Sequence, residues 1–148
     1  MNALTIANAL ADKFASGALT PPAGYGAIRK STAALPNAIP TSPWVLVILP
    51  RGSVKLGAQQ LTHTFEYHVQ FHYAKSTGDT ARDMTGMLSW LGVLLTATYV
   101  DMDLGISGVM KAYPTTYDMV VFTYGGDEFY GWDITWMVDL NEAQVMQP

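Results

Sequence analysis

The stretch LTHTFEYHVQFHYAK (Leu61–Lys75) decides the fold, because its side chains alternate in character along its whole length. One set of alternate positions holds mostly bulky apolar residues: Leu61, His63, Phe65, Tyr67, Val69, Phe71 and Tyr73. The other set is polar: Thr62, Thr64, Glu66, His68, Gln70 and His72. A period of two predicts a long β-strand with one face on a core and one polar face.

This stretch also contains every histidine of the chain, which raises the question of a metal site. His68 and His72 share a strand face, but four residues separate them by about 13 Å. His63 points to the opposite face. Zinc holds its nitrogen ligands at about 2.0–2.1 Å, so a pair on one strand should be two residues apart. We therefore expect no metal and no other cofactor, and a polar face that meets solvent or another subunit.

The region before this strand predicts a helix, an extended arm and a buried strand. Apolar residues at helical spacing (Leu4, Ala7, Ala11 and Phe14, with Leu10 beside them) indicate an N-terminal helix that ends near Gly17. Seven proline and glycine residues in 18–43 indicate an extended arm over about 17–43, with a short strand near 27–33. The apolar run from Trp44 to Leu49 predicts a strand buried on both faces. We expect the following segment, RGSVKLGAQQ, to form a loop.

A second helix is expected from about Asp79 to Ala97. Its core stripe is predicted to be Met84, Leu88, Leu91 and Leu95. A second apolar stripe on the other side consists of Gly86, Trp90, Val93 and Ala97. Two explanations of this second stripe stay open: it packs on the N-terminal helix, or it contacts another subunit.

The C-terminal third predicts a hairpin. Residues 101–118 look irregular, with a short strand near 109–112. Strands at 119–124 and 129–140 flank the turn formed by Gly125 and Gly126, and residues 141–148 are expected to fray. The element order predicts one domain over 1–148, of the α+β class. Its mixed, mostly antiparallel sheet of about four to five strands has both helices packed on one face.

Composition narrows the function classes. Only 14% of the residues are charged, against about 25% in an average domain, which favours burial of surface against other subunits. Eight Lys and Arg residues and a net charge of −4 provide no basic footprint for nucleic acid. The absence of cysteine excludes disulfides and thiolate catalysis. The N-terminus does not resemble a signal peptide, and the uncharged run Met84–Val100 is shorter than a membrane span.

No chemical motif indicates an enzyme. Asp101 and Asp103 form a D-x-D pair, but the glycine and glutamate of a calcium-binding loop are missing from their positions. The glycines near residues 24–26 and 105–108 fit neither a dinucleotide loop nor a nucleophile elbow. Acidic residues that could act with a histidine are present, yet none forms a distinctive pair. We expect no catalytic residues.

The ordered pattern of these segments resembles the tail terminator proteins of long-tailed bacteriophages. The similarity lies in the N-terminal helix, the proline-rich arm AALPNAIPTSPWVLVILP, the alternating strand LTHTFEYHVQFHYAK and the helix opening that contains TARDM. It continues through the loop DMDLGISG and the closing hairpin VVFTYGGDEFYGWDITWMVDL. The resemblance covers nearly the whole chain, but its motifs are loose patterns that neighbouring neck and tail-completion proteins share.

The resemblance implies a non-enzymatic homo-oligomeric ring, typically of about six subunits, at the head–tail joint of a virion. Such a ring stops growth of the tail tube, contacts the tail tube protein and the head connector, and lets DNA pass without binding it specifically. Assembly in the host cytoplasm is implied too. The candidate docking residues are Arg51, Lys55, Gln59, Asp101 and Asp103, and the candidate subunit contacts are Trp90, Val93 and Ala97.

Two alternatives stay open at this stage. One is another connector or neck protein of the same joint. The other is a small α+β ligand-binding domain or hydrolase, with a cleft around Glu66, His68 and His72.

Overall fold

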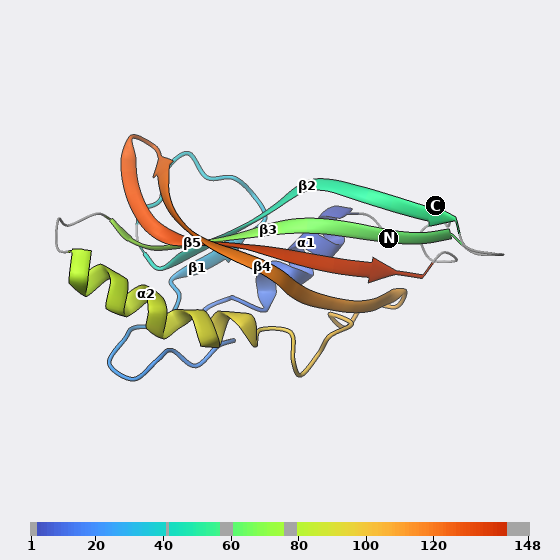
Figure 1. The fold of residues 1–148 in the computed structure, drawn as a ribbon, viewed down its shortest axis with the longest axis horizontal. Helices are drawn as coiled ribbons and strands as arrows, with labels where there is room; N and C mark the ends of the chain where they lie inside the picture. The colour runs from blue at the N-terminus through green and yellow to red at the C-terminus, as the bar shows by residue number, and fades with distance from the viewer. Residues whose placement is uncertain (1–2, 41, 57–60, 76–79, 142–148) are drawn as a thin grey trace.

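The computed structural model describes residues 3–40, 42–56, 61–75 and 80–141. Two helices and five strands follow one another along this part of the chain (Figure 1). The order is α1 (Ala3–Asp12), β1 (Lys30–Thr32), β2 (Trp44–Leu56), β3 (Leu61–Lys75), α2 (Thr80–Leu95), β4 (Val109–Tyr124) and β5 (Asp127–Leu140). The predicted α+β class is confirmed.

The described strands form one sheet in the order β1-β2-β3-β5-β4. Every neighbouring pair is antiparallel except β1 and β2, which are parallel over three residues. The sheet is therefore mixed and mostly antiparallel, as predicted. The stretch Leu61–Lys75 forms β3, the central strand, with β2 on one side and β5 on the other.

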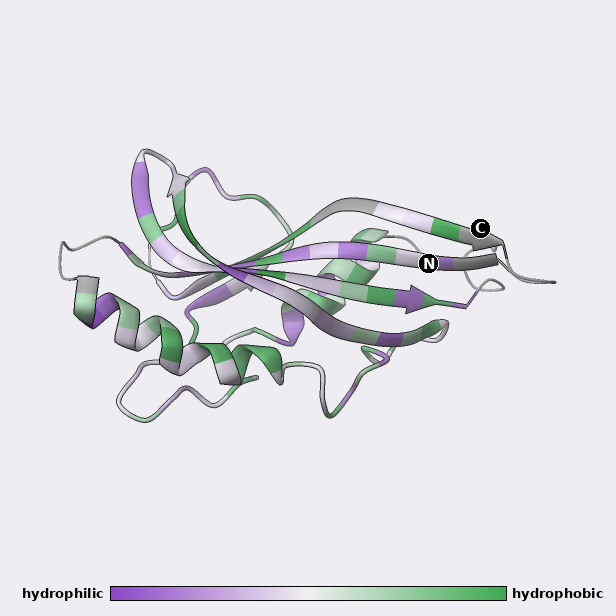
Figure 2. Ribbon diagram, in the orientation of Figure 1, coloured by the Kyte–Doolittle hydropathy of each residue, from purple (hydrophilic) through white to green (hydrophobic). Residues whose placement is uncertain are grey.

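Both helices pack on one face of the sheet, and hydrophobic residues recur along them (Figure 2). Tyr67, Val69 and Phe71 of β3 point into this core, which confirms the predicted apolar face. From β5, alternate residues join them: Trp132, Ile134, Trp136, Val138 and Leu140. The buried hydroxyl of Tyr67 donates to the Ala3 carbonyl at 2.9 Å and so fixes the start of α1. Burial raises the pKa of Tyr67.

Helix α1 buries a slightly different stripe from the predicted one. Ile6, Ala7, Leu10 and Ala11 are buried, and Phe14 just beyond the helix packs edge-on against Trp136 at 5.4 Å. Leu4, which we expected in the core, is 62% exposed. Ile6 occupies the core position because it precedes Leu10 by about one helical turn on the sheet-facing side.

Helix α2 packs on the sheet with a face rotated from the predicted one: Met87, Trp90 and Leu94 are fully buried, whereas Leu91 and Leu95 of the predicted stripe are only partly buried against the core. The expected core residues Met84 and Leu88 are exposed, whereas Trp90 has no exposed surface and packs on Phe71 at 5.3 Å between ring centroids. Gly86 explains the choice, because its missing side chain leaves room for the Tyr73 ring of β3. The bulk of Trp90 and the close approach at Gly86 together orient the helix.

Strand β2 continues beyond the predicted end at Leu49. The ladder with β3 shifts register between Ile48 and Arg51 and then runs on to Leu56. Pro50 falls inside this irregularity, where a missing N–H breaks no regular pairing. The predicted loop from Arg51 is therefore wrong as far as Leu56, and residues 57–60 lie outside the described residues.

Strand β4 corrects the irregular segment predicted at 101–118. The strand begins at Val109 and passes through Pro114, where a register shift to Thr116 interrupts the ladder with β5. β4 is an edge strand, so a proline there removes no hydrogen bond to another strand. The predicted turn is confirmed: Gly125 and Gly126 both have positive φ, as a two-residue hairpin turn of this type requires.

A second, smaller apolar cluster lies on the other face of the sheet, near the β4–β5 turn. It contains Ile39, Trp44, Leu46 and Phe129, with Phe122 and Tyr124 packed against it. The extended arm supplies Ile39, and the Tyr124 hydroxyl donates to the Pro36 carbonyl. The arm thus covers one end of the face that the helices leave free.

Candidate functional site

The face of the sheet opposite the helices is polar over the half that the arm does not cover. We define this polar face by alternate residues of three strands: Thr64, Glu66 and His68 of β3, Asp133, Thr135 and Asp139 of β5, and Thr116 and Asp118 of β4. Cross-strand pairing places them on one side, as in Thr64–Asp139 and Asp118–Asp133. Four of the eight side chains are carboxylates, and Lys111 of β4 adds a positive charge beside Asp139, so the described side chains of this face carry an excess of negative charge.

Several of these side chains are held by neighbours. His68 Nδ1 lies 2.8 Å from Asp133 Oδ1, and Thr64 donates its hydroxyl to Asp139 Oδ1 at 3.0 Å. Lys111 Nζ lies 3.8 Å from Asp139 Oδ2. Burial, together with the Asp139 charge, raises the pKa of the Tyr113 hydroxyl nearby. Asp133 and Asp139 are therefore held in place on this face by their neighbours.

His72 departs from the prediction for the polar face. It is fully buried in the second apolar cluster, with its ring 4.4 Å from Phe122 and 5.8 Å from Phe129. Its Nδ1 lies 3.3 Å from the Gln70 carbonyl, and its Nε2 has no hydrogen-bond partner among the described residues. Burial lowers its pKa. We expected it to meet solvent or another subunit, but the arm and the hairpin cover it.

The predicted cleft around Glu66, His68 and His72 is therefore not assembled. His68 lies on the polar face against Asp133, whereas His72 is sealed between aromatic rings. Within the described residues, no three histidine or acidic side chains gather closely enough to hold a metal ion. Among the described residues, the side chains that the hydrolase alternative invoked do not share one cleft.

An apolar strip lies along the border between α2 and the edge strand. We define the apolar strip as Met84 and Leu88 of α2 with Tyr117, Met119 and Val121 of β4, whose exposed fractions range from 36% to 57%. A hollow of about 280 Å³ separates the two elements and is lined by Met84, Met87, Met119 and Val121, among others. Contiguous exposed apolar side chains typically mark an interaction surface.

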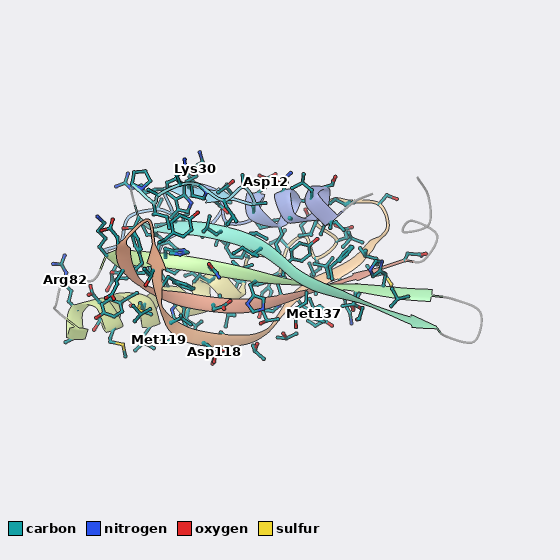
Figure 3. All side chains as sticks on the ribbon, turned by 90° about the horizontal axis from the view of Figure 1, so that it is seen from above. Asp12, Lys30, Arg82, Asp118, Met119 and Met137 are labelled. Carbon is teal, nitrogen blue, oxygen red and sulfur yellow. The ribbon has the colours of Figure 1, made fainter. Side chains whose placement is uncertain are left out.

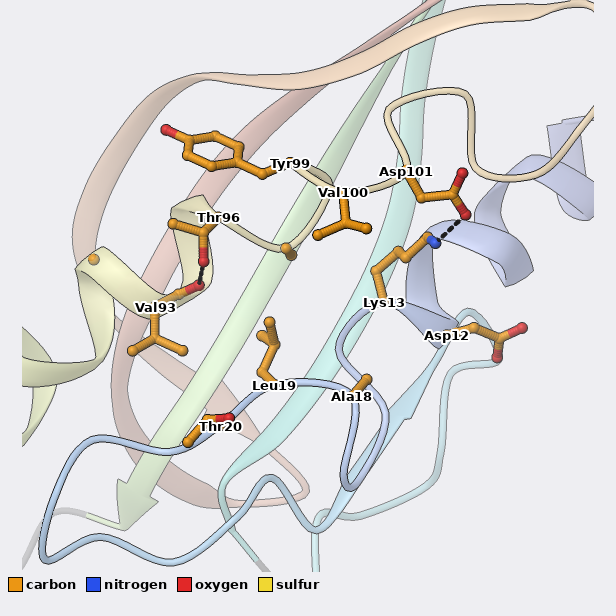
Figure 4. A pocket seen from close by; sticks show the side chains of 12 residues that line it. Asp12, Lys13, Ala18, Leu19, Thr20, Val93, Thr96, Tyr99, Val100 and Asp101 are labelled. Atoms are coloured by element: carbon orange, nitrogen blue, oxygen red, sulfur yellow. Dashed lines mark hydrogen bonds and ion pairs between the residues drawn. The ribbon is translucent and has the colours of Figure 1, made fainter.

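A wider groove of about 1080 Å³ lies between the ends of the two helices (Figure 4). The groove is lined by Leu19, Val93 and Val100, among others. Two further lining residues, Lys13 and Asp101, form an ion pair in which Nζ and Oδ2 lie 2.7 Å apart. The Lys13 ammonium holds the pKa of the Asp101 carboxyl below its usual value. Asp103 instead accepts a hydrogen bond from the Gly105 amide at 2.9 Å. Asp101 and Asp103 thus belong to one accessible loop but serve different local bonds.

The predicted docking residues fall on different elements. Arg51 and Lys55 lie in β2 instead of a loop, and Gln59 is outside the described residues. Asp101 and Asp103 follow α2. The predicted docking residues thus come from two separate elements, and their role in docking stays a prediction.

The predicted subunit contacts need one correction. Trp90 is buried inside its own chain, so its side chain is not available to another subunit. Val93 and Ala97 are half-buried and line the groove between the helix ends. Sequence reasoning missed the apolar strip, although Met84 and Leu88 were recognised as a stripe and assigned to the core.

No helix in the described part of the chain has the length and apolar character needed to cross a membrane. A comparison with protein families found no family model that matches the chain, and a search of the curated proteins found no match.

Proposed function

We propose that this protein is a structural subunit of a bacteriophage tail terminator, a homo-oligomeric ring that ends the tail tube and joins it to the head. The sequence resemblance to tail terminators motivates the proposal. The surfaces of the fold support it independently. In the proposed role the protein catalyses no reaction and acts through the shape and contacts of the ring.

The observation that carries the proposal is the two-sided sheet. Helices and the main core occupy one face, whereas the other carries Glu66, Asp118, Asp133 and Asp139. A wall with an acidic inner face repels phosphate groups and suits a channel through which DNA slides without sticking. We assign the polar face to the lumen of the ring and the helices to its outside.

The uncharged character of the remaining surface fits a ring as well. Each subunit of a closed ring buries two different patches against its two neighbours. The apolar strip is one such patch on a chain that has only 14% charged residues. Its exposed methionines and aliphatic residues would be costly on a monomer in water.

The mass of the purified protein, by sedimentation or native mass spectrometry, tests the ring. We expect a discrete oligomer of about six 16.1 kDa chains, or a monomer that assembles only on the ends of purified tail tubes. A strict monomer that also fails to cap such tubes would contradict the proposal. Another connector protein of the same joint is the second candidate, and tail length separates the two.

A further inference from the structure

Among the described strands, two stretches of edge have no partner. One is the second half of β4, on one border of the sheet, and the other is the second half of β2, on the other border. On one border, the beginning of β4 is already occupied: the Ala112 amide donates to the Met102 carbonyl at 2.6 Å, and the Thr98 hydroxyl donates to the Ala112 carbonyl at 2.8 Å. Pro114 has no N–H to offer. From 115 to 124, no described strand pairs with the outer edge of β4.

The other border is open at the other end. β1 pairs with β2 only from Trp44 to Leu46. Over 47–56, the edge of β2 that faces away from β3 has no partner among the described strands. This half of the β2–β3 hairpin also extends beyond both helices (Figure 1). Unpaired edges of this length recruit other strands unless they are protected.

We propose that these two edges pair with each other between neighbouring copies of the chain: residues 115–124 of β4 in one copy with residues 47–56 of β2 in the next. The inference rests on the proposed ring and names its subunit contact. Within one chain β2 and β4 run in opposite directions, as the alternating pairings show. A rotation about the ring axis preserves strand directions along that axis, so the new pair is antiparallel.

The offset between the two open edges agrees with closure into a barrel. Met119, near the middle of the β4 edge, lies at the level of Val45 across the sheet. The middle of the open β2 edge, Gly52, pairs with Phe65, six β3 residues from Phe71, because the register shift in β2 takes up one residue. Six residues span about 20 Å at 3.3 Å per residue. Five strands are about 24 Å wide, so the resulting tilt is about 40°, within the 35–45° that closed barrels show.

The side chains match on both faces of the joint. On the helix side, Val54 is 58% exposed and would meet the similarly exposed Tyr117 and Met119 of the apolar strip. Asp118 lies on the polar face at the sheet border (Figure 3). In the register of β2, Arg51 and Lys55 take the positions two before and two after Ser53. The joint therefore brings two basic positions of β2 next to Asp118, and the apolar Val54 next to Tyr117 and Met119.

A specific register satisfies both matches. With Asp118 opposite Ser53, Arg51 and Lys55 take the two diagonal positions next to Asp118, and Tyr117 faces Val54. Directly opposite residues of an antiparallel pair have Cα atoms about 4.5–5.5 Å apart, within the range for a disulfide. The same two residues of one chain are three strand spacings apart, or about 14 Å, so a cross-link between them joins two copies.

Cysteine cross-linking tests this contact without background, because the chain contains no cysteine. The test variant combines Val54→Cys with Tyr117→Cys. The matched control combines Val54→Cys with Met110→Cys, which is 61% exposed but lies on the occupied half of β4. Mild oxidation of the assembled protein, in solution and on capped tail tubes, should give a ladder of covalent multimers for the test variant and monomer for the control.

The outcomes separate this contact from the ring itself. Oligomers that form normally but give no ladder with the test variant overturn the edge pairing and leave the ring standing. Covalent multimers from the control variant but not from the test variant also overturn the edge pairing. If neither variant nor the unmodified protein assembles in solution or on tails, the ring and the contact are both wrong.

Discussion

Gly131 shows at the residue scale how closely β3 and β5 approach. A Cβ at this position would collide with the Phe71 carbonyl of the neighbouring strand, and backbone atoms cannot move aside as a flexible side chain can. Only glycine fits, because it has no Cβ.

We predict that Gly131→Ala lowers the free energy of unfolding by about 1–3 kcal/mol through overpacking. Gly92→Ala is the matched control. Gly92 lies inside α2 with open space around it, so the substitution should raise stability by about 0.5–1 kcal/mol through helix propensity. Urea denaturation measures both. Equal effects of the two substitutions would contradict the close approach at Gly131.

His72 gives the fold a pH dependence. Burial lowers its pKa below the usual 6.5, so the folded chain keeps a neutral ring after the unfolded chain has taken up a proton. Stability is therefore complete above pH 6.5 and falls as the pH drops from 6.5 toward the lowered folded value.

We predict that the melting temperature of the unmodified protein declines as the pH falls from about 6.5 to about 5.5, and that His72→Phe reduces this decline. Phenylalanine keeps an aromatic ring among Phe122, Tyr124 and Phe129 but cannot be protonated. Thermal melts across this range measure the effect, with His63→Gln as the control. An unchanged slope in His72→Phe would show that another group is responsible.

Residue periodicity predicted the faces of β3 and β5 correctly, because a period of two is unambiguous in a long strand. It did not predict that His72 is buried. That burial depends on the arm residue Ile39 and on Phe122 and Phe129, which lie far from His72 in sequence. The sequence assigns a residue to a face of the sheet, but only the tertiary structure shows what covers that face.

At the scale of elements, α2 shows why two apolar stripes on one helix are hard to rank. Both stripes are hydrophobic, and the leucine and methionine stripe is the more apolar by composition. The structure fully buries neither stripe: the helix turns Met87, Trp90 and Leu94 to the core, because Trp90 fills the space over Phe71 and Gly86 admits the Tyr73 ring. Shape complementarity outweighed hydrophobicity.

We predict that Trp90→Ala lowers the free energy of unfolding by about 3–5 kcal/mol, because it leaves a cavity in the core. Leu88→Ala, on the exposed side of the same helix, should change it by less than about 0.5 kcal/mol. Chemical denaturation of the dissociated chain compares the two. If Leu88→Ala lowers the free energy of unfolding more than Trp90→Ala does, the core stripe expected from the sequence is the right one.

Two prolines lie inside strands at places where the sequence predicted no strand. β2 and β4 continue past Pro50 and Pro114 at register shifts. Both sit where a missing N–H does no harm, Pro50 at an irregularity and Pro114 on an edge strand. The sequence does not tell which strand will be at an edge, so neither continuation could be predicted.

The edge pairing predicts a charge effect on assembly. Asp118→Lys should weaken association of the copies about threefold to fivefold at low salt, since it replaces an attraction to Arg51 and Lys55 with repulsion. Adding Lys55→Glu should restore most of the loss. Sedimentation at several concentrations measures the association. Lys75→Glu, at an exposed pair with Asp127 away from the joint, is the control and should leave association unchanged.

At the scale of the whole molecule, the described fold is a β-sheet with two different faces and two partly unpaired edge strands. The helices and core lie on one side, the acidic polar face on the other, and the unpaired edges of β2 and β4 lie at the ends that adjacent copies would join. The α+β class and the placement of both helices could be predicted from element order alone. The open edges could not, because they depend on the loop that occupies the start of β4.

The length of tails assembled without this protein tests the central claim most directly. Electron microscopy of particles from a phage that lacks it should show tail tubes that grow beyond their normal length and carry no heads, because nothing ends polymerisation. Supplying the intact chain should restore normal length and head joining. Tails of normal length that merely lack heads would contradict the terminator role and assign the protein to another component of the joint.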